Sequence, residues 1–247
     1  MLYLLRRHPI AVTAYFRHSL VLTYALPPEI LAPLLPEGLA LDTFRGYAFL
    51  AIALVETEKL RPSILPAFLG RDFFLSGYRI FTRLAGGAHS RRGLKILRSD
   101  ANRGWMVRAG SLLTHYNYRL CRADLEECEG RIHWAIATAG QEADLEVVAD
   151  VEGAAAALPE GSPFATIDEA RRFAGPLPYT FEYEEQTRSI IGVLAERQTW
   201  DPRPVAVEVR KNTFLEHEPF CRARPILANA FYVRNVPYKW QCGRRLK

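Results

Sequence analysis

Four residues near the middle of the chain have side chains that could bind a small organic acid. Arg79 carries a guanidinium group, which can hold a carboxylate through two parallel hydrogen bonds. His115 can give or take a proton near neutral pH, and Tyr78 and Tyr116 each add a hydroxyl group. If these groups meet in a pocket, we expect a site for a small anionic ligand, or for acid/base chemistry on a keto acid or an enol.

Two carboxylates in a later segment form a second candidate group. Glu182 and Glu184 are two residues apart in a segment typical of a strand, so they share one face of it. The paired carboxylates of a glycosidase stand on opposing walls of the site, whereas carboxylates on one strand are more often solvated. A buried Arg79 could also pair with either of them only to satisfy its charge. We retain Glu182 as a candidate ligand contact and leave the catalytic residues unassigned.

The chain has few lysines that could act as a nucleophilic amine. They are Lys59, Lys95, Lys211, Lys239 and Lys247. Lys95 is the one inside an apolar run, between Leu94 and Ile96, and alternation along a strand turns it to the face opposite these two. With its neighbours facing the core, we expect Lys95 to lie at the surface.

Other catalytic and binding chemistries lack the spacing that they need. The histidines never occur as H-x-H or H-x-x-x-H, and the four cysteines, Cys121, Cys128, Cys221 and Cys242, show no C-x-x-C spacing. There is no Gly-x-Ser-x-Gly elbow, and Gly86-Gly87 lacks the spacing of a phosphate loop. We therefore expect neither a metal nor a cofactor.

Composition limits the partners and the location. The net charge is +5, but the basic residues are spread along the chain among carboxylates, which argues against a nucleic-acid partner. The longest apolar stretch, residues 47–55, is far shorter than the roughly 20 residues of a membrane-spanning helix. No signal-peptide pattern follows Arg6 and Arg7, so a cytoplasmic protein is expected. No linker divides the chain, and we expect a single domain over residues 1–247.

Most segments that must position these groups are predicted to be strands. Strand patterns cover residues 18–26, 39–43, 46–55, 73–84, 94–97, 116–121, 129–139, 145–151, 179–183, 190–195 and 205–214. The segments 39–43 and 46–55 are expected to pair with each other, and 73–84 is expected to form a hairpin with 94–97 around Gly86-Gly87.

Three short helices are predicted among these strands. They cover residues 28–35, 105–113 and 167–173, the last with a capping box of Thr166 and Glu169. Strands outnumber helices and follow one another directly. The prediction is a mainly β (α+β) fold, an antiparallel β-barrel with a few short peripheral helices, and not a doubly wound α/β sheet.

A series of motifs runs through most of the chain. It consists of Tyr24-x-x-Pro27-Pro28, Leu34-Leu35-Pro36-x-Gly38-Leu39-x-Leu41-Asp42, Gly46-Tyr47-Ala48-Phe49, Tyr78-Arg79, Asp100-Ala101-Asn102, Gly161-Ser162, the aromatic run 179–183 and Trp200. In this order the motifs resemble the uncharacterised YqjF-like family (domain of unknown function 2071) of the acetoacetate decarboxylase-like superfamily. The resemblance implies a cone-like antiparallel barrel with an interior pocket, and it places the segments of Arg79 and His115 on interior strands.

The resemblance also bears on the chemistry. Acetoacetate decarboxylases form a Schiff base on a lysine within a Gly-x-Pro-Lys-Lys run, whereas the matching residues 110–116 here contain no lysine. We therefore expect a protein that binds a small anionic organic ligand and lacks the Schiff-base lysine. An enzyme that uses acid/base chemistry on a keto acid or an enol is the alternative, and a structural or assembly domain is a third. Relatives of this fold often assemble, so a homo-oligomer is compatible with the resemblance.

Overall fold

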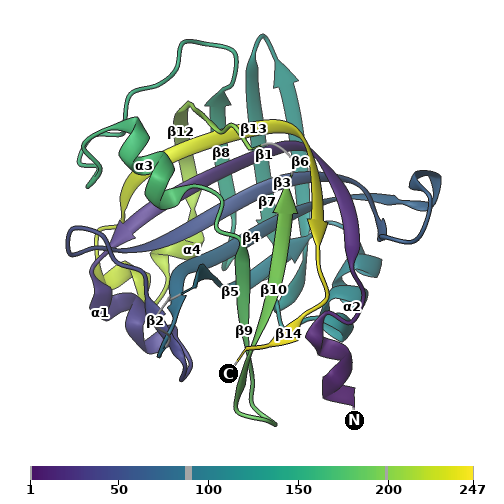
Figure 1. Ribbon diagram of the computed structural model, residues 1–247. Coiled ribbons are helices and arrows are strands. Elements are labelled where there is room, and N and C mark those ends of the chain that lie inside the picture. Colours follow the sequence, from purple (N-terminus) through teal and green to yellow (C-terminus); the bar gives the residue numbers. More distant parts are fainter. Residues whose placement is uncertain (1, 87–90, 198–199, 247) are drawn as a thin grey trace.

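The computed structural model describes residues 2–86, 91–197 and 200–246, and its strands form one connected sheet (Figure 1). The strands are β1 (Val12–Leu26), β2 (Leu39–Leu41), β3 (Ala48–Pro62), β4 (Arg71–Leu84), β5 (Arg92–Ala101), β6 (Tyr118–Cys128), β7 (Arg131–Thr138), β8 (Leu145–Asp150), β9 (Tyr179–Glu184), β10 (Ser189–Arg197), β11 (Arg203–Pro204), β12 (Ala206–Asn212), β13 (Ile226–Trp240) and β14 (Arg244–Arg245). The α-helices are α1 (Pro28–Leu31), α2 (Gly104–Leu113), α3 (Ile167–Ala174) and α4 (Thr213–Glu216), and the 3-10 helices are η1 (Leu2–Arg7), η2 (Ala32–Leu34), η3 (Ala67–Leu69) and η4 (Phe220–Arg222).

Part of this sheet closes on itself. The strand pairings run through β1, β3, β4, β5, β9, β10 and β13 and then return to β1. Neighbours in this ring are antiparallel, except that β5 and β9 are parallel. The mainly β fold with short peripheral helices is confirmed, and most of its pairings are antiparallel; β5 pairs in parallel with β6 and with β9.

Strand β5 is a fork in the sheet. One of its edges pairs with β9 over residues 93–95 and then, from residue 99, with β6, both in parallel. From β6 the sheet continues through β7, β8 and β12, away from the ring. Between the two pairings, side chains satisfy backbone carbonyls: Lys95 Nζ donates to the Ile96 oxygen at 3.1 Å, and Asn117 Nδ2 to the Leu97 oxygen at 2.9 Å. The fork therefore admits polar side chains where a continuous sheet would not.

The two faces of the ring have different roles. The outer face packs against β7 and β8 in a core that includes Ile52, Tyr78 and Trp134. On the inner face, Phe49 and Phe81 pack with Phe173 of α3 and fill one end of the ring. Helix α2 and the N-terminal segment lie together at another part of the ring, away from α3 (Figure 1).

The structure corrects some of the predicted elements. Residues 39–43 and 46–55 do not pair as expected, because β2 pairs with β4. The 15 residues of β13 were not predicted as a strand, although β13 joins β1 to β10. The pairing of β4 with β5 and the helices α2 and α3 are confirmed, and the side chain of Thr166 accepts from Glu169 N at 3.1 Å. Gly87, which belongs to the predicted turn, and His89 lie outside the described residues.

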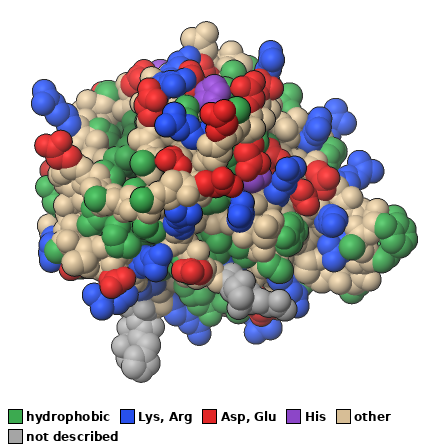
Figure 2. All heavy atoms as spheres, turned by 90° about the horizontal axis from the view of Figure 1, so that it is seen from above, with side chains coloured by type: hydrophobic (Ala, Val, Ile, Leu, Met, Phe, Trp, Pro, Cys, Tyr) green, Lys and Arg blue, Asp and Glu red, His purple; other side chains and the backbone are tan. Residues whose placement is uncertain are grey.

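Within the described ranges, no helix is long and apolar enough to cross a membrane. Viewed from above, acidic and basic side chains are interleaved on the face shown in Figure 2 and do not form one basic patch. The absence of a nucleic-acid partner and the cytoplasmic location stay predictions.

Candidate functional site

A cavity of about 250 Å³ lies inside the ring of strands. All seven strands of the ring and helix α2 contribute to its wall. Representative lining residues are Phe16 of β1, Leu60 of β3, Arg79 of β4, Ile96 of β5, Thr180 of β9, Arg197 of β10, Tyr238 of β13 and Met106 of α2.

Small residues on β3 and β4 make room for Arg79. Arg79 is paired with Ala51 on β3, and Gly77 is paired with Ala53, so small residues lie opposite and beside Arg79 on this face. A Cβ atom added to Gly77 would lie 2.8 Å from Arg79 Nε and 2.9 Å from Nη2. The guanidinium therefore lies directly over Gly77, where no larger residue would fit without moving it.

Arg79 borders the cavity without an acidic partner. Its Nε atom is buried and has no hydrogen-bond partner among the described residues. Burial lowers the pKa of Arg79, and nearby Arg197 lowers it further, whereas Tyr116, Tyr118 and Tyr238 act in the opposite direction. The described residues that line the cavity include no Asp or Glu. The wall thus presents a positive charge that nothing in the described chain neutralises.

Both candidate carboxylates pair with other cations, so the alternative in which a buried Arg79 pairs with Glu182 or Glu184 is wrong. Glu184 accepts from Arg7 at 2.7 Å and 2.5 Å. Glu182 accepts from Lys95 Nζ at 2.7 Å. Both carboxylates are buried, whereas carboxylates on one strand were expected to be solvated.

The prediction that Lys95 lies at the surface is also wrong. Only 14% of its side chain is exposed. The reason is the fork, because Lys95 is the last residue of β5 that pairs with β9, and its ammonium group forms an ion pair with Glu182 of that strand. The alternation of side chains along β5 alone therefore did not predict where the ammonium group of Lys95 lies.

Tyr116 is part of the cavity wall, and Glu182 lies behind this wall, close enough for its charge to act on Tyr116. Burial raises the pKa of Glu182 to about 7, against the opposing effect of Lys95, and its Oε1 atom has no partner among the described residues. Tyr116 lines the cavity, and its hydroxyl lies 2.8 Å from Thr180 Oγ1. Burial raises the pKa of Tyr116, and the charge of Glu182 adds to this effect. Glu182 itself is not among the residues that line the cavity.

The charged groups that act on His115 include Arg6, Glu184 and Lys95, and not Arg79. His115 does not line the cavity, and its Nε2 atom is buried without a partner in the described chain. Burial lowers the pKa of His115, and Arg6 lowers it further, whereas Glu184 raises it. The structure therefore brings Arg79 and Tyr116 to the same cavity and leaves His115 with the charges near the N-terminus.

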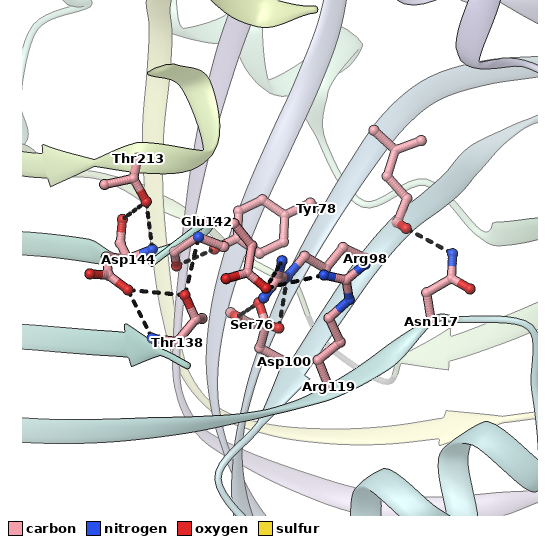
Figure 3. A network of polar contacts seen from close by, with 12 residues as sticks. Ser76, Tyr78, Arg98, Asp100, Asn117, Arg119, Thr138, Glu142, Asp144 and Thr213 are labelled. Atoms are coloured by element: carbon pink, nitrogen blue, oxygen red, sulfur yellow. Dashed lines mark hydrogen bonds and ion pairs between the residues drawn. The ribbon is translucent and has the colours of Figure 1, made fainter. Parts of the chain in front are cut away.

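Tyr78 lies outside the cavity, on the opposite face of β4 from Arg79. Its hydroxyl donates to the Ala143 oxygen at 3.2 Å, and its ring centre is 4.2 Å from that of Phe214. Figure 3 shows Tyr78 beside Arg98 and Asp100, in a polar network that joins the ring to the rest of the sheet. This predicted ligand contact thus packs in the core between the two parts of the sheet.

Arg197 and Tyr238 are among the cavity residues that the sequence did not indicate. Arg197 Nη2 donates to the Tyr238 hydroxyl at 2.8 Å and to the Leu177 oxygen at 3.0 Å. Tyr238 lies on β13, so it could not be assigned to the interior before that strand was recognised. Arg197 ends β10, and extending the alternation of residues 190–195 by two positions would have placed it on the face of Val193 and Ala195. No group of His, Cys, Asp and Glu that could hold a metal occurs in the described parts of the chain.

Solved structures with a similar fold share little sequence with this chain. Acetoacetate decarboxylase from Legionella pneumophila subsp. pneumophila str. Philadelphia 1 has a TM-score of 0.61 at 11% identity, over 97% of this chain and 88% of its own. An acetoacetate decarboxylase-like enzyme from Sphingomonas wittichii RW1 has a TM-score of 0.63 at 16% identity, over 98% and 95%. The enduracididine biosynthesis enzyme MppR, complexed with pyruvate, has a TM-score of 0.61 at 13% identity, over 97% and 91%. These likenesses show that the fold is acetoacetate decarboxylase-like.

No curated protein matches this sequence. A family model does match it, over residues 13–237, which is most of the chain. On that match, the chain belongs to the DUF2071 family, which is described as an uncharacterized conserved protein (COG2071).

Proposed function

We propose that this protein binds a small organic carboxylate inside the ring of strands and that Arg79 holds the carboxylate group. The observation that carries the proposal is the guanidinium of Arg79, which borders the cavity with no carboxylate to neutralise it. An enclosed charge without a partner is unfavourable. A ligand carboxylate would supply that partner through two parallel hydrogen bonds.

Binding without an imine step fits the position of the lysines. No lysine is among the described residues that line the cavity. Lys95 Nζ is held by Glu182 and by the Ile96 oxygen, so its lone pair is not available as a nucleophile while the ion pair persists. MppR, a protein of similar fold, was solved with pyruvate, which supports a small carboxylate as the kind of ligand this architecture accepts.

The alternative of acid/base catalysis by His115, Tyr116 and Arg79 has less support from the geometry. His115 does not reach the cavity that Arg79 borders. Burial raises the pKa of Tyr116, which makes its hydroxyl a weaker acid near neutral pH. We therefore propose binding as the function, with Arg79 and Tyr116 as the contacts.

Thermal unfolding in the presence of small carboxylic acids tests this proposal. An acid at about 100 times its dissociation constant should stabilise the protein by roughly 2.7 kcal/mol. For a chain of this size, each kcal/mol corresponds to about 2–4 °C in Tm. The variant Arg79→Met should lose this shift, because it keeps the length of the side chain and removes the charge.

Arg122→Met is the matched control, since it removes an equal charge from a side chain that is 82% exposed and does not line the cavity. This variant should respond to acids like the wild type. The proposal is wrong if no acid stabilises the wild type, or if Arg79→Met responds as the wild type does.

A further inference from the structure

The volume of the cavity is larger than the smallest organic acids need. A cavity of about 150 Å³ lined by apolar side chains is sufficient for benzene. The cavity here is about 250 Å³. Acetate or pyruvate bound at Arg79 would leave most of this space without contacts, and empty space next to apolar walls loses dispersion energy.

The wall beyond Arg79 is apolar and largely aromatic. Along β4 the inner face continues from Arg79 through Gly77 and Leu75 to Phe73, which is roughly 20 Å of strand at about 3.3 Å per residue. The ring centres of Phe73 and Trp105 are 5.6 Å apart and their planes are at 76°. On the opposite strands, Phe16 stacks on Tyr238 with centres 4.4 Å apart. Aromatic walls of this kind favour a ring between them, through offset and edge-to-face contacts.

Several polar groups of the wall are already paired with one another. The hydroxyls of Tyr116 and Thr180 lie 2.8 Å apart, and the Tyr238 hydroxyl accepts from Arg197 at 2.8 Å. The guanidinium of Arg79 takes part in neither of these pairs, and its Nε atom, like that of Arg197, has no partner in the described chain.

From these three observations we infer that the ligand is an arylalkanoic acid, with its carboxylate on Arg79 and its aromatic ring among Phe16, Phe73 and Trp105. This inference rests on the proposed carboxylate site and adds the chemical class of the ligand body. It distinguishes this cavity from one built for a small, polar keto acid.

Calorimetric titration of the wild type with four probes tests the inference. The probes are hydrocinnamate, propanoate, pyruvate and the neutral hydrocinnamyl alcohol. Hydrocinnamate should bind roughly 10- to 100-fold more tightly than propanoate or pyruvate, as expected for burial of one phenyl ring. The alcohol, which has the same ring and no charge, should bind at least about tenfold more weakly than hydrocinnamate.

Two variants distinguish the contribution of the ligand's carboxylate to the affinity from that of its aromatic ring. Arg79→Met should reduce the affinity for hydrocinnamate to that of the alcohol. Met106→Trp, on the α2 side of the cavity, should reduce the affinity for hydrocinnamate and leave that for propanoate unchanged, because it fills space that only the ring needs. The comparison of probes on the wild type holds even if a variant fails to fold.

The failures of the two proposals are distinguishable. If propanoate or pyruvate binds as tightly as hydrocinnamate and depends on Arg79, the carboxylate site stands and the aromatic ligand class is wrong. If the alcohol binds as tightly as the acid, or if no carboxylate binds the wild type, the carboxylate site itself is wrong.

Discussion

Lys95 and Glu182 form a buried ion pair beside the cavity, in which each charge compensates the other. Removing one partner of such a pair leaves an uncompensated buried charge unless that charge can be neutralised by a proton. Burial already raises the pKa of Glu182 to about 7, and Lys95 is the main group that opposes this rise. The pair therefore couples the stability of the fork to pH.

The variant Lys95→Met should make this coupling visible. The pKa of Glu182 is higher in the folded chain than its ordinary value of 4.5, so protonation favours the folded state. This contribution is fully present below the ordinary value and is lost as the pH rises towards about 7. Without Lys95 the folded pKa rises further, so Lys95→Met should lose more Tm relative to the wild type at about pH 8.5 than at about pH 5.5.

Lys239→Met is the control for this comparison, because Lys239 and Glu196 pair at 4.0 Å with both side chains substantially exposed. Its effect on Tm should be small and nearly independent of pH. A loss of Tm in Lys95→Met that is the same at both pH values would contradict the assigned coupling.

The sequence indicated some residues of the site correctly and misplaced others. Arg79 was identified because the family resemblance places its segment on an interior strand, where an arginine can hold a carboxylate, and the structure places it at the cavity. Lys95, Glu182 and His115 were placed wrongly or incompletely, since their surroundings depend on the fork of β5 and on the N-terminal segment. Contacts between segments so far apart in the chain leave no periodic signal in either one.

At the scale of elements, β4 positions the site through its alternation of large and small residues. Its inner face presents Gly77 beneath the guanidinium of Arg79, and its outer face presents Tyr78 to the other core. A bulge in the pairing of β4 with β5 falls between Tyr78 and Arg79. The strand thus carries a binding residue on one face and a packing residue on the other.

Gly77→Ala should separate binding from folding. The added Cβ would displace the guanidinium of Arg79, whose Nε and Nη2 atoms lie 2.8 and 2.9 Å from its position. Because the obstructing atoms belong to the end of a flexible side chain, we expect the Tm to change by only a few °C. The affinity for the carboxylate ligand should fall by about tenfold, as expected for a misplaced bidentate contact.

Gly104→Ala is the matched control, because a Cβ at Gly104 in α2 would meet nothing within 4 Å. It should leave the affinity unchanged. If Gly77→Ala also left the affinity for the carboxylate ligand unchanged, the Arg79 guanidinium would not bind the ligand from its position over Gly77.

The helices and strands were easier to predict from the sequence than the pairing of the strands. The helices α2 and α3 and most strands follow from periodicity and capping, which are local properties. Strand β13 was missed although it contains the β-favouring run Phe231-Tyr232-Val233, and its Pro237 weakens the pattern. The pairing of β2 with β4 depends on the path of β3 through the ring, and no turn signal encodes it.

The whole molecule divides the interior of its ring into two parts. Near α3, Phe49, Phe81 and Phe173 pack against one another, and all three are buried. Further along the same strands, Ala51, Ala53 and Gly77 leave the space that becomes the cavity. The closely packed part and the outer core supply the stability, so the cavity can hold a group that stabilises nothing in the absence of a ligand.

Arg79→Met should therefore make the ligand-free protein more stable. If Arg79 were a structural residue, removing it would leave partners unsatisfied, and the Tm would fall. Because no described carboxylate pairs with it and its Nε atom lacks a partner, replacing it with an apolar side chain should raise the free energy of unfolding by roughly 1–3 kcal/mol. That gain corresponds to about 2–4 °C in Tm for each kcal/mol in a chain of this length.

The measurement is thermal or urea unfolding of ligand-free Arg79→Met and wild type, with Arg122→Met as the control for a loss of surface charge. The control should stay within about 0.5 kcal/mol of the wild type. A lower stability for Arg79→Met would show that Arg79 supports the fold, and it would remove the reason to regard the unpaired guanidinium as a binding group. A higher stability together with a loss of carboxylate binding is the pattern expected where a fold gives up stability to keep a site.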